Sequence, residues 1–311
     1  MEETDRLNYI KAVQCLYTID AGFDRETMPG ARSRYDDFVG THLLQTPSIH
    51  FDGLFLAFHR HYLHQYTLAL QDECDYYGPV PYWDWSKFWK DPLQAAVLDG
   101  SDTSFGSDGE YIPNRNDSIV KFPHAPEVII PPGTGGGCLK DGPFKDYKMN
   151  LGPVLLEPQG PDGGRGFNPR CINRDISKLM AGNSRPSNLT KVLAAKDLGE
   201  FNLLIDDAAS GVHTNGHFQL GGIQLDPFVS PSDPIFWLHH GMIDYLWSVW
   251  QGQDYAGRRD QVWGTGTIGN IPPSDNVTLD TLINFEVLSD GPRPVREFVS
   301  TIEGPYCYVY E

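Results

Sequence analysis

Apolar residues recur at helical spacing in several stretches of the chain. Leu7, Ile10, Val13 and Leu16 repeat every three or four residues, which places them on one face of a helix. The same spacing recurs further along and predicts a mainly α-helical fold. The predicted helices cover residues 5–18, 33–45, 51–73, 191–209 and 234–251.

The last of these helices, 234–251, is largely apolar. Ser232 or Asp233 can cap it, and Pro234 suits its first turn. The helix stays apolar until it reaches two adjacent histidines, His239 and His240. Burying such a polar pair is costly unless something binds it. We therefore expect this helix to form one wall of a buried metal site.

Two long regions lack a helical pattern. Residues 91–185 are rich in Gly, Pro, Asp and Asn and predict irregular but packed loops, because a free loop of this length is improbable in a compact domain. Residues 263–311 alternate polar and apolar positions and predict short strands, notably 296–302 and 306–310. No repeat or linker divides the chain, so we expect a single domain over residues 1–311.

Composition and net charge exclude some classes of binding partner. The net charge of −17 argues against nucleic acid and anionic membrane surfaces, and it tolerates neutral or cationic small substrates. No apolar run is long enough to span a bilayer. An apolar content of 40% supports a sizeable core. This charge and composition are compatible with an enzyme that acts on small molecules. They do not determine the oligomeric state.

The five cysteines are scattered and form no CxxC pair, which disfavours a structural zinc site. Cys138 and Cys171 are the best disulfide pair within the irregular region, and Cys15 and Cys74 are further disulfide candidates. The odd count leaves the state of Cys307 open.

Three glycosylation sequons, at Asn116, Asn188 and Asn276, join the scattered cysteines in favouring a secreted protein. Residues 1–5 do not resemble a signal peptide, so an intracellular protein stays the alternative to a mature secreted form.

The ten histidines are not spread evenly. Three lie on or beside the second and third predicted helices, two are spaced i, i+4 in 213–217, and one lies in the last helix. Neutral imidazoles without thiolate favour a redox-capable copper over structural zinc. Two sets of three facing each other across a helix bundle would form a dinuclear centre. The six candidate ligands are His42, His50, His59, His213, His217 and His240.

The other four histidines, His61, His64, His124 and His239, do not fit this geometry, and we expect them to pack or to form hydrogen bonds.

Asp244 lies one turn beyond His240 and shares its helix face. It either orients an imidazole of the metal site or pairs with Arg60, and the sequence does not decide between the two.

At this point a family resemblance is clear. Residues 50–63 resemble the first copper signature of the tyrosinase, catechol oxidase and hemocyanin superfamily, in which a histidine precedes an aromatic-His-Arg box. Residues 233–244 resemble the second signature, whose ligand is the histidine four before the Asp; this selects His240 over His239. His213 and His217, followed by two glycines, match the other ligands of the second copper, and His42 takes the place of the first ligand.

Shorter pieces are similar to the short fungal polyphenol oxidases, namely residues 81–85, 135–144, 168–175 and 306–308. The resemblance implies an antiparallel four-helix bundle that holds two copper ions, with long irregular loops and a few short β-strands. It implies a type 3 copper centre that oxidises o-diphenols to o-quinones and reduces O2 to water. Phe218 and Phe228 are candidates to line the substrate site.

Several positions depart from the family pattern. Thr67 stands where the first signature usually ends in Glu, and Ser48 stands where many fungal members carry a thioether-forming Cys, so we expect no thioether. Tyr245 replaces the usual Arg after the Asp of the second signature.

Two further departures bear on the reaction. Thr214 replaces an Asn that many monophenol-hydroxylating members carry, and 207–213 offers no counterpart of their upstream Glu. Asp206 and Asp207 are possible substitutes, although their spacing argues against both. We therefore expect an o-diphenol oxidase with weak or absent monophenol hydroxylation. Alternatives are a tyrosinase, an o-aminophenol oxidase, a hemocyanin-like oxygen carrier and a zinc hydrolase that uses the HxxxH pair.

Overall fold

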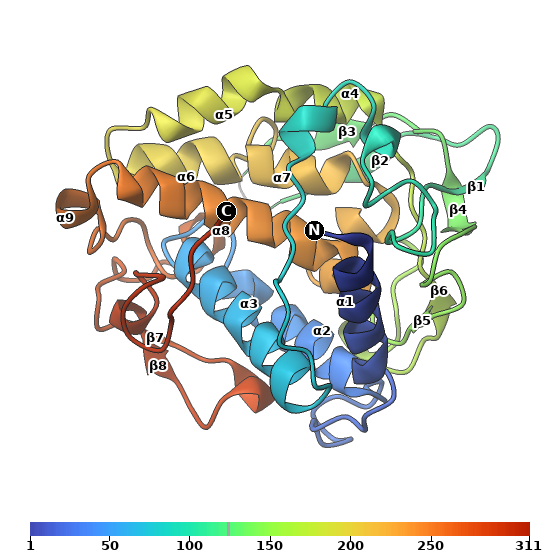
Figure 1. The fold of residues 1–311 in the computed structure, drawn as a ribbon, viewed down its shortest axis with the longest axis horizontal. Helices are drawn as coiled ribbons and strands as arrows, with labels where there is room; N and C mark the ends of the chain where they lie inside the picture. The colour runs from blue at the N-terminus through green and yellow to red at the C-terminus, as the bar shows by residue number, and fades with distance from the viewer. Residues whose placement is uncertain (123–124) are drawn as a thin grey trace.

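A computed structural model describes residues 1–122 and 125–311, so His124 lies outside the described residues. The fold is mainly helical, with a few short strands and long irregular segments, as the sequence predicts (Figure 1). Its helices are α1 (Glu3–Leu16), α2 (Arg34–Gln45), α3 (Phe55–Asp72), α4 (Lys178–Ala181), α5 (Pro186–Leu193), α6 (Leu198–Asp206), α7 (Val212–Phe218), α8 (Ile235–Gly252) and α9 (Tyr255–Arg258).

Local chemistry explains where the helices begin. Ser33 and Asp36 form a reciprocal capping box at the start of α2. The helix predicted from residue 51 begins only at Phe55, because Phe51 has a positive φ of 52° and cannot join an α-helix. Gly53 lies so close to the carbonyl of Trp263 that an added Cβ would approach it to 2.0 Å. A tight turn therefore precedes α3.

The single helix predicted over 191–209 is wrong, because the region contains two helices. Pro186 starts α5, and α5 ends at Leu193. Asp197 then starts α6 as a new cap, and its side chain accepts a hydrogen bond from the backbone N–H of Glu200. The second of these helices, α6, packs against α7, which carries His213 and His217.

Four helices carry the predicted metal ligands or lie directly beside them: α2, α3, α7 and α8. Helix α8 packs against both α3 and α7, and it crosses the centre of the molecule in Figure 1. The main hydrophobic core draws residues from Tyr9 in α1 to Tyr306 near the C-terminus. Trp237 on α8 lies deep in it, stacked on Tyr66 of α3 with ring centroids 3.8 Å apart.

The strands form two-stranded antiparallel pairs: β1 (Gly109–Tyr111) with β4 (Gly136–Leu139), β2 (Ser118–Val120) with β3 (Val128–Ile130), β5 (Lys148–Met149) with β6 (Arg170–Cys171), and β7 (Leu282–Ile283) with β8 (Arg293–Pro294). Six of these eight lie in the region predicted to be irregular but packed. The β2–β3 pair belongs to a second, smaller hydrophobic cluster that also contains Phe218.

The strands predicted at 296–302 and 306–310 are wrong. A 3₁₀ turn occupies Val295–Glu297, and residues 306–310 run without a ladder partner. Their alternating pattern has another cause. Phe298 and Tyr306 are buried in the core, and the hydroxyls of Tyr308 and Tyr310 donate hydrogen bonds to Asp244.

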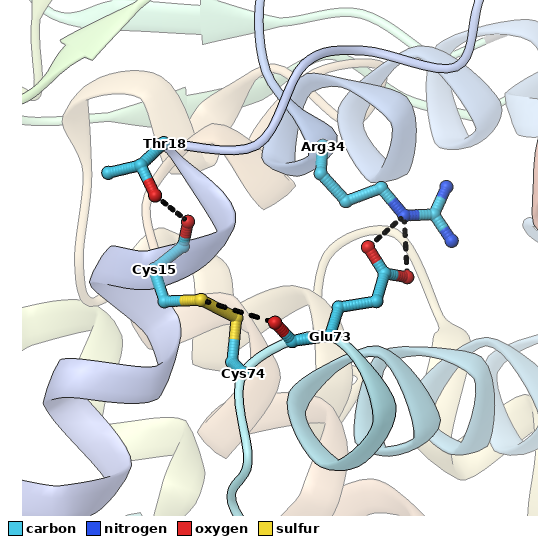
Figure 2. The surroundings of a disulfide bond; sticks show 5 residues. All are labelled: Cys15, Thr18, Arg34, Glu73 and Cys74. Atoms are coloured by element: carbon cyan, nitrogen blue, oxygen red, sulfur yellow. Dashed lines mark hydrogen bonds and ion pairs between the residues drawn. A yellow bond between two sulfur atoms is a disulfide. The ribbon is translucent and has the colours of Figure 1, made fainter.

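Two disulfides tie distant segments together. Cys138 pairs with Cys171, as predicted, and Cys15 pairs with Cys74. The second bond joins the end of α1 to the residue after the C-terminal cap of α3, next to the ion pair between Arg34 and Glu73 (Figure 2). Cys307 is a free, exposed thiol.

Candidate metal centre

Two buried groups of histidines lie in the centre of the helix bundle. The first contains His42, His50 and His59, and the second contains His213, His217, His239 and His240. Within each group the candidate ligand atoms lie within 4.8 Å of one another. The structure therefore brings together all six histidines that the sequence singles out.

The first group comes from two helices and the loop between them. His42 lies in the last turn of α2, His59 lies on α3, and His50 precedes the turn at Phe51. Each ring donates its Nδ1–H to a backbone carbonyl: His42 to Phe228 at 3.2 Å, His50 to Thr46 at 3.3 Å, and His59 to Phe55 at 2.8 Å. A carbonyl oxygen can only accept, so these bonds place the proton on Nδ1 and leave Nε2 with a free lone pair.

The second group uses side-chain acceptors. His213 Nδ1 lies 2.7 Å from Oδ1 of Asp206, and His217 Nδ1 lies 2.6 Å from Oε1 of Gln224. The amide nitrogen of Gln224 donates to the Ser230 carbonyl at 2.9 Å, which leaves its oxygen facing the histidine. Acceptors of this kind fix the orientation of metal-binding imidazoles.

The Nε2 atoms converge. His217 Nε2 lies 3.1 Å from Nε2 of His213 and 3.3 Å from Nε2 of His240, and the Nε2 atoms of His42 and His59 are 3.4 Å apart. Two lone pairs cannot hydrogen-bond to each other, so such a convergence is unfavourable without a cation between them. The donor sets therefore fit metal ions, and neutral imidazoles without thiolate suit copper.

His239 differs from its neighbour because both of its ring nitrogens are engaged. Trp85 Nε1–H donates to His239 Nδ1 at 3.1 Å. The opposite nitrogen, Nε2, donates to the backbone carbonyl of His213 at 3.0 Å. No lone pair is left for a metal, although His239 lies within reach of the second group. Its hydrogen bonds instead tie α8 to α7 and to the segment that carries Trp85.

The two groups face each other directly. The rings of His59 and His240 stack with centroids 4.3 Å apart, and those of His50 and His213 are nearly parallel at 6.1 Å. Histidines from opposite groups, which are far apart in the sequence, therefore lie side by side.

Two phenylalanines that the sequence did not single out pack against the histidine rings. Phe236 stacks on His240 with centroids 4.1 Å apart, and Phe55 lies 4.8 Å from His59 and 4.6 Å from His213. Each precedes a histidine by four residues, a spacing that puts both side chains on one helix face. That spacing was the available signal. Trp83, Trp85, Phe58 and Trp237 are buried as well.

Burial lowers the pKa of all six histidines, and their neighbouring imidazoles lower several of them further. The pKa of His50 falls to about 3 and that of His217 to about 4. Those of His42, His59, His213 and His240 are also lowered well below the usual value. The rings are therefore neutral at neutral pH, which is the form that binds a metal.

These pKa shifts predict an acid-sensitive fold for the copper-free protein. Below pH about 6.5 the unfolded chain protonates its histidines while the folded chain keeps them neutral, so the free energy of unfolding falls as the pH drops. The loss is expected to begin at pH about 6.5 and to continue below pH 4, because His217 protonates in the folded state only near pH 4 and His50 only near pH 3. Urea unfolding across this range measures it. His217→Gln is expected to flatten the slope, and an unchanged slope would contradict the assignment.

The structure chooses between the two partners considered for Asp244. Its Oδ1 lies 2.6 Å from Nε of Arg60, and both side chains are almost fully buried. The hydroxyls of Tyr308 and Tyr310 each donate to its Oδ2 at 2.6 Å. Asp244 therefore joins α8 to α3 and to the C-terminal segment, and it orients no histidine.

The remaining predicted site residues serve mainly the backbone or the core. The Thr214 hydroxyl donates to the carbonyls of Asp207 at 2.7 Å and Gly211 at 3.0 Å. Phe228 contributes its carbonyl to His42, and Phe218 belongs to the second hydrophobic cluster. His61 accompanies Tyr306, with its Nδ1 2.9 Å from that hydroxyl.

Positions that depart from the family pattern have local roles. Ser48 donates to the Gln45 carbonyl and Thr67 donates to the Leu63 carbonyl. The ring of Tyr245 stacks on Tyr82. Asp206 and Gln224, in contrast, contact histidines and were not predicted as hydrogen-bond partners of the site.

A helix bundle with two facing histidine groups defines a dinuclear metal protein. The family model described as the common central domain of tyrosinase matches residues 32–253, and the chain belongs to this family. It is accordingly a type 3 copper oxidoreductase that uses two copper ions, with phenolic compounds and O2 as the substrates of the family.

Similar proteins support the same family. The chain is 38% identical to tyrosinase P of Aspergillus terreus over 320 residues, covering 100% of this chain and 89% of that protein. It is 37% identical over 331 residues to the N-acetyl-6-hydroxytryptophan oxidase ivoB of Emericella nidulans, covering 99% and 89%. A polyphenol oxidase variant from Thermothelomyces thermophila superposes with a TM-score of 0.94 at 35% identity, covering 100% and 86%.

Proposed function

We propose that His42, His50 and His59 hold one copper ion and that His213, His217 and His240 hold the other. The observation that carries this assignment is the convergence of Nε2 lone pairs in rings whose Nδ1 protons mostly have fixed acceptors. His239 is excluded because both of its nitrogens are already bonded. The bound copper pair supplies the two-electron exchange with O2, and the chain supplies position and a dry surrounding.

We further propose oxidation of o-diphenols as the main reaction. Hydroxylating a monophenol requires removal of its phenolic proton, which benefits from a nearby free base. Both oxygens of Asp206 are taken, one by His213 and one by the backbone N–H of Phe51 at 2.6 Å. Asp207 caps the turn at Ser210, and the Thr214 hydroxyl is bonded to the backbone. These occupied groups offer no free base beside the histidines.

A substrate panel tests this proposal. Copper-loaded protein, with its copper content quantified, is expected to oxidise catechol rapidly and to oxidise tyrosine or phenol at less than about a hundredth of that rate, because general-base assistance contributes about 10² or more to proton removal. Oxygen uptake and quinone absorbance measure the rates with catechol and with the monophenols. Rapid monophenol turnover without a lag would show that the protein is a tyrosinase instead.

Two other outcomes of the panel separate the alternatives. Preferred turnover of o-aminophenols would assign an o-aminophenol oxidase, a reaction that the same copper ligands allow. Reversible oxygen binding without catechol turnover would indicate a carrier, and zinc without copper would indicate a hydrolase. The printed name of the 37%-identical oxidase, which concerns a hydroxytryptophan, makes hydroxylated indoles a useful addition to the panel.

We propose secretion on the strength of two disulfides and two exposed sequons. Asn116 and Asn276 are exposed, whereas the Asn188 amide nitrogen donates to the Asn183 carbonyl at 2.8 Å and is less available for a glycan. Within residues 1–122 and 125–311, no helix has the length and apolar character needed to cross a membrane.

A further inference from the structure

Asp206 lies at the end of α6, between the two histidine groups. Its side chain is buried, with 4% of the residue exposed. One oxygen, Oδ1, contacts His213 Nδ1 at 2.7 Å, and the other, Oδ2, accepts from the backbone N–H of Phe51 at 2.6 Å. We propose that Asp206 is a positioning residue that links the two copper sites and fixes their separation. This inference rests on the ligand assignment proposed above.

Both contacts require that the Asp206 oxygen accept a hydrogen bond. The backbone N–H of Phe51 can only donate. When His213 binds a metal through Nε2, its proton lies on Nδ1, so that nitrogen also donates. A carboxylate provides two acceptor oxygens at once, which is the pattern that these two donors demand.

Each contact affects the position of one proposed copper ligand: the first acts on His50 and the second on His213. Phe51 directly follows His50, and its positive φ of 52° is a conformation that a phenylalanine rarely adopts, so an anchor on its N–H helps to hold the turn. The other contact sets the ring orientation of His213. Because the rings of His50 and His213 face each other at 6.1 Å, one carboxylate holds a facing pair of ligands from opposite groups.

The link also explains the break between α6 and α7. Asp206 is the last residue of α6, and α7 begins at Val212 with His213 as its second residue. The five residues between them turn the chain so that a carboxylate seven positions upstream meets the His213 ring. This spacing differs from the one-turn spacing along a continuous helix, and only the turn allows the contact.

Asp206→Asn is a sharp test, because asparagine has a single acceptor oxygen. Its amide NH2 must face either the Phe51 N–H or the His213 Nδ1–H, so one of the two contacts breaks. Asp207→Asn is a matched control one residue away. Asp207 is exposed, and its carboxylate accepts hydrogen bonds within the turn at Ser210 and Ala209 rather than from a histidine.

The variants are compared as copper-loaded proteins by copper content, by electron paramagnetic resonance of the oxidised form, and by kcat and KM for catechol. A correctly spaced cupric pair is magnetically coupled and silent, so a disturbed spacing gives a signal. Asp206→Asn is expected to show this signal or to lose one copper, with kcat reduced about 10- to 100-fold, the usual cost of losing a hydrogen-bond partner of a metal ligand. Asp207→Asn is expected to stay silent with an unchanged kcat.

If Asp206→Asn does not fold, Asp206→Glu decides the question, because it keeps two acceptor oxygens on a side chain one methylene longer. It is expected to bind two coppers with a detectable signal and a reduced kcat. A foldable variant of either kind that binds two coppers, stays silent and keeps kcat within about twofold of the parent would overturn the inference. Failure of the parent protein itself to bind two coppers would instead overturn the ligand assignment.

Discussion

His240→Ala is expected to lose one copper ion and to abolish catechol oxidation, whereas His239→Ala is expected to retain both coppers. The two residues are adjacent, equally buried, and on the same helix. They differ in the state of their ring nitrogens. His240 directs Nε2 at His217 Nε2, 3.3 Å away, while His239 has both nitrogens bonded to Trp85 and to the His213 carbonyl.

Copper per protein, determined by elemental analysis, and oxygen uptake with catechol measure the outcome. His239→Ala removes two buried hydrogen bonds. It is therefore expected to lower the free energy of unfolding by about 1–3 kcal/mol, because buried partners are left unpaired. Activity is expected to fall far less than in His240→Ala. Equal loss of copper in both variants would refute the assignment of His240 alone and would bring His239 into the ligand set.

Asp244→Ala is expected to destabilise the protein by about 3–5 kcal/mol, because it leaves Arg60 buried without its charged partner. The Arg60 guanidinium is fully buried, and Asp244 also accepts the hydroxyls of Tyr308 and Tyr310. Losing the carboxylate therefore releases the C-terminal segment from α8 as well. Urea unfolding of the copper-free protein measures the change without interference from metal binding.

A matched control is available on the surface. Glu303 pairs with Arg259 at 2.9 Å, but the two side chains are 52% and 35% exposed. Exposed ion pairs contribute little, so Glu303→Ala is expected to cost no more than about 1 kcal/mol. If Asp244→Ala cost as little as Glu303→Ala, the buried pair would not be holding α3, α8 and the C-terminal segment together.

The burial of the six histidines and their contact with aromatic rings follow from the same helix packing. Phe55 and Phe236 each lie one helical turn before a histidine and close off its ring. The helices that bring the histidines together therefore also supply the apolar side chains around them. In such a setting neutral imidazoles are favoured over charged ones, which agrees with the lowered pKa values of all six.

The sequence by itself determined the mainly helical fold, the copper family and the positions of the six histidines. These are local properties: helical spacing, the i, i+4 pair at His213 and His217, and short signatures around His59 and His240. These properties can be read from the sequence because a helix places residues at a regular spacing on one common face.

Only the tertiary structure decided how these parts are joined. The choice of Arg60 as partner of Asp244 depends on α3 lying beside α8, a contact between residues 184 positions apart. The link from Asp206 to both Phe51 and His213 depends on a turn whose path no periodic pattern encodes. The predicted C-terminal strands failed for the same reason: alternation shows which side chains are buried, whereas a strand also needs a partner backbone, and that partner is set by the packing of distant segments.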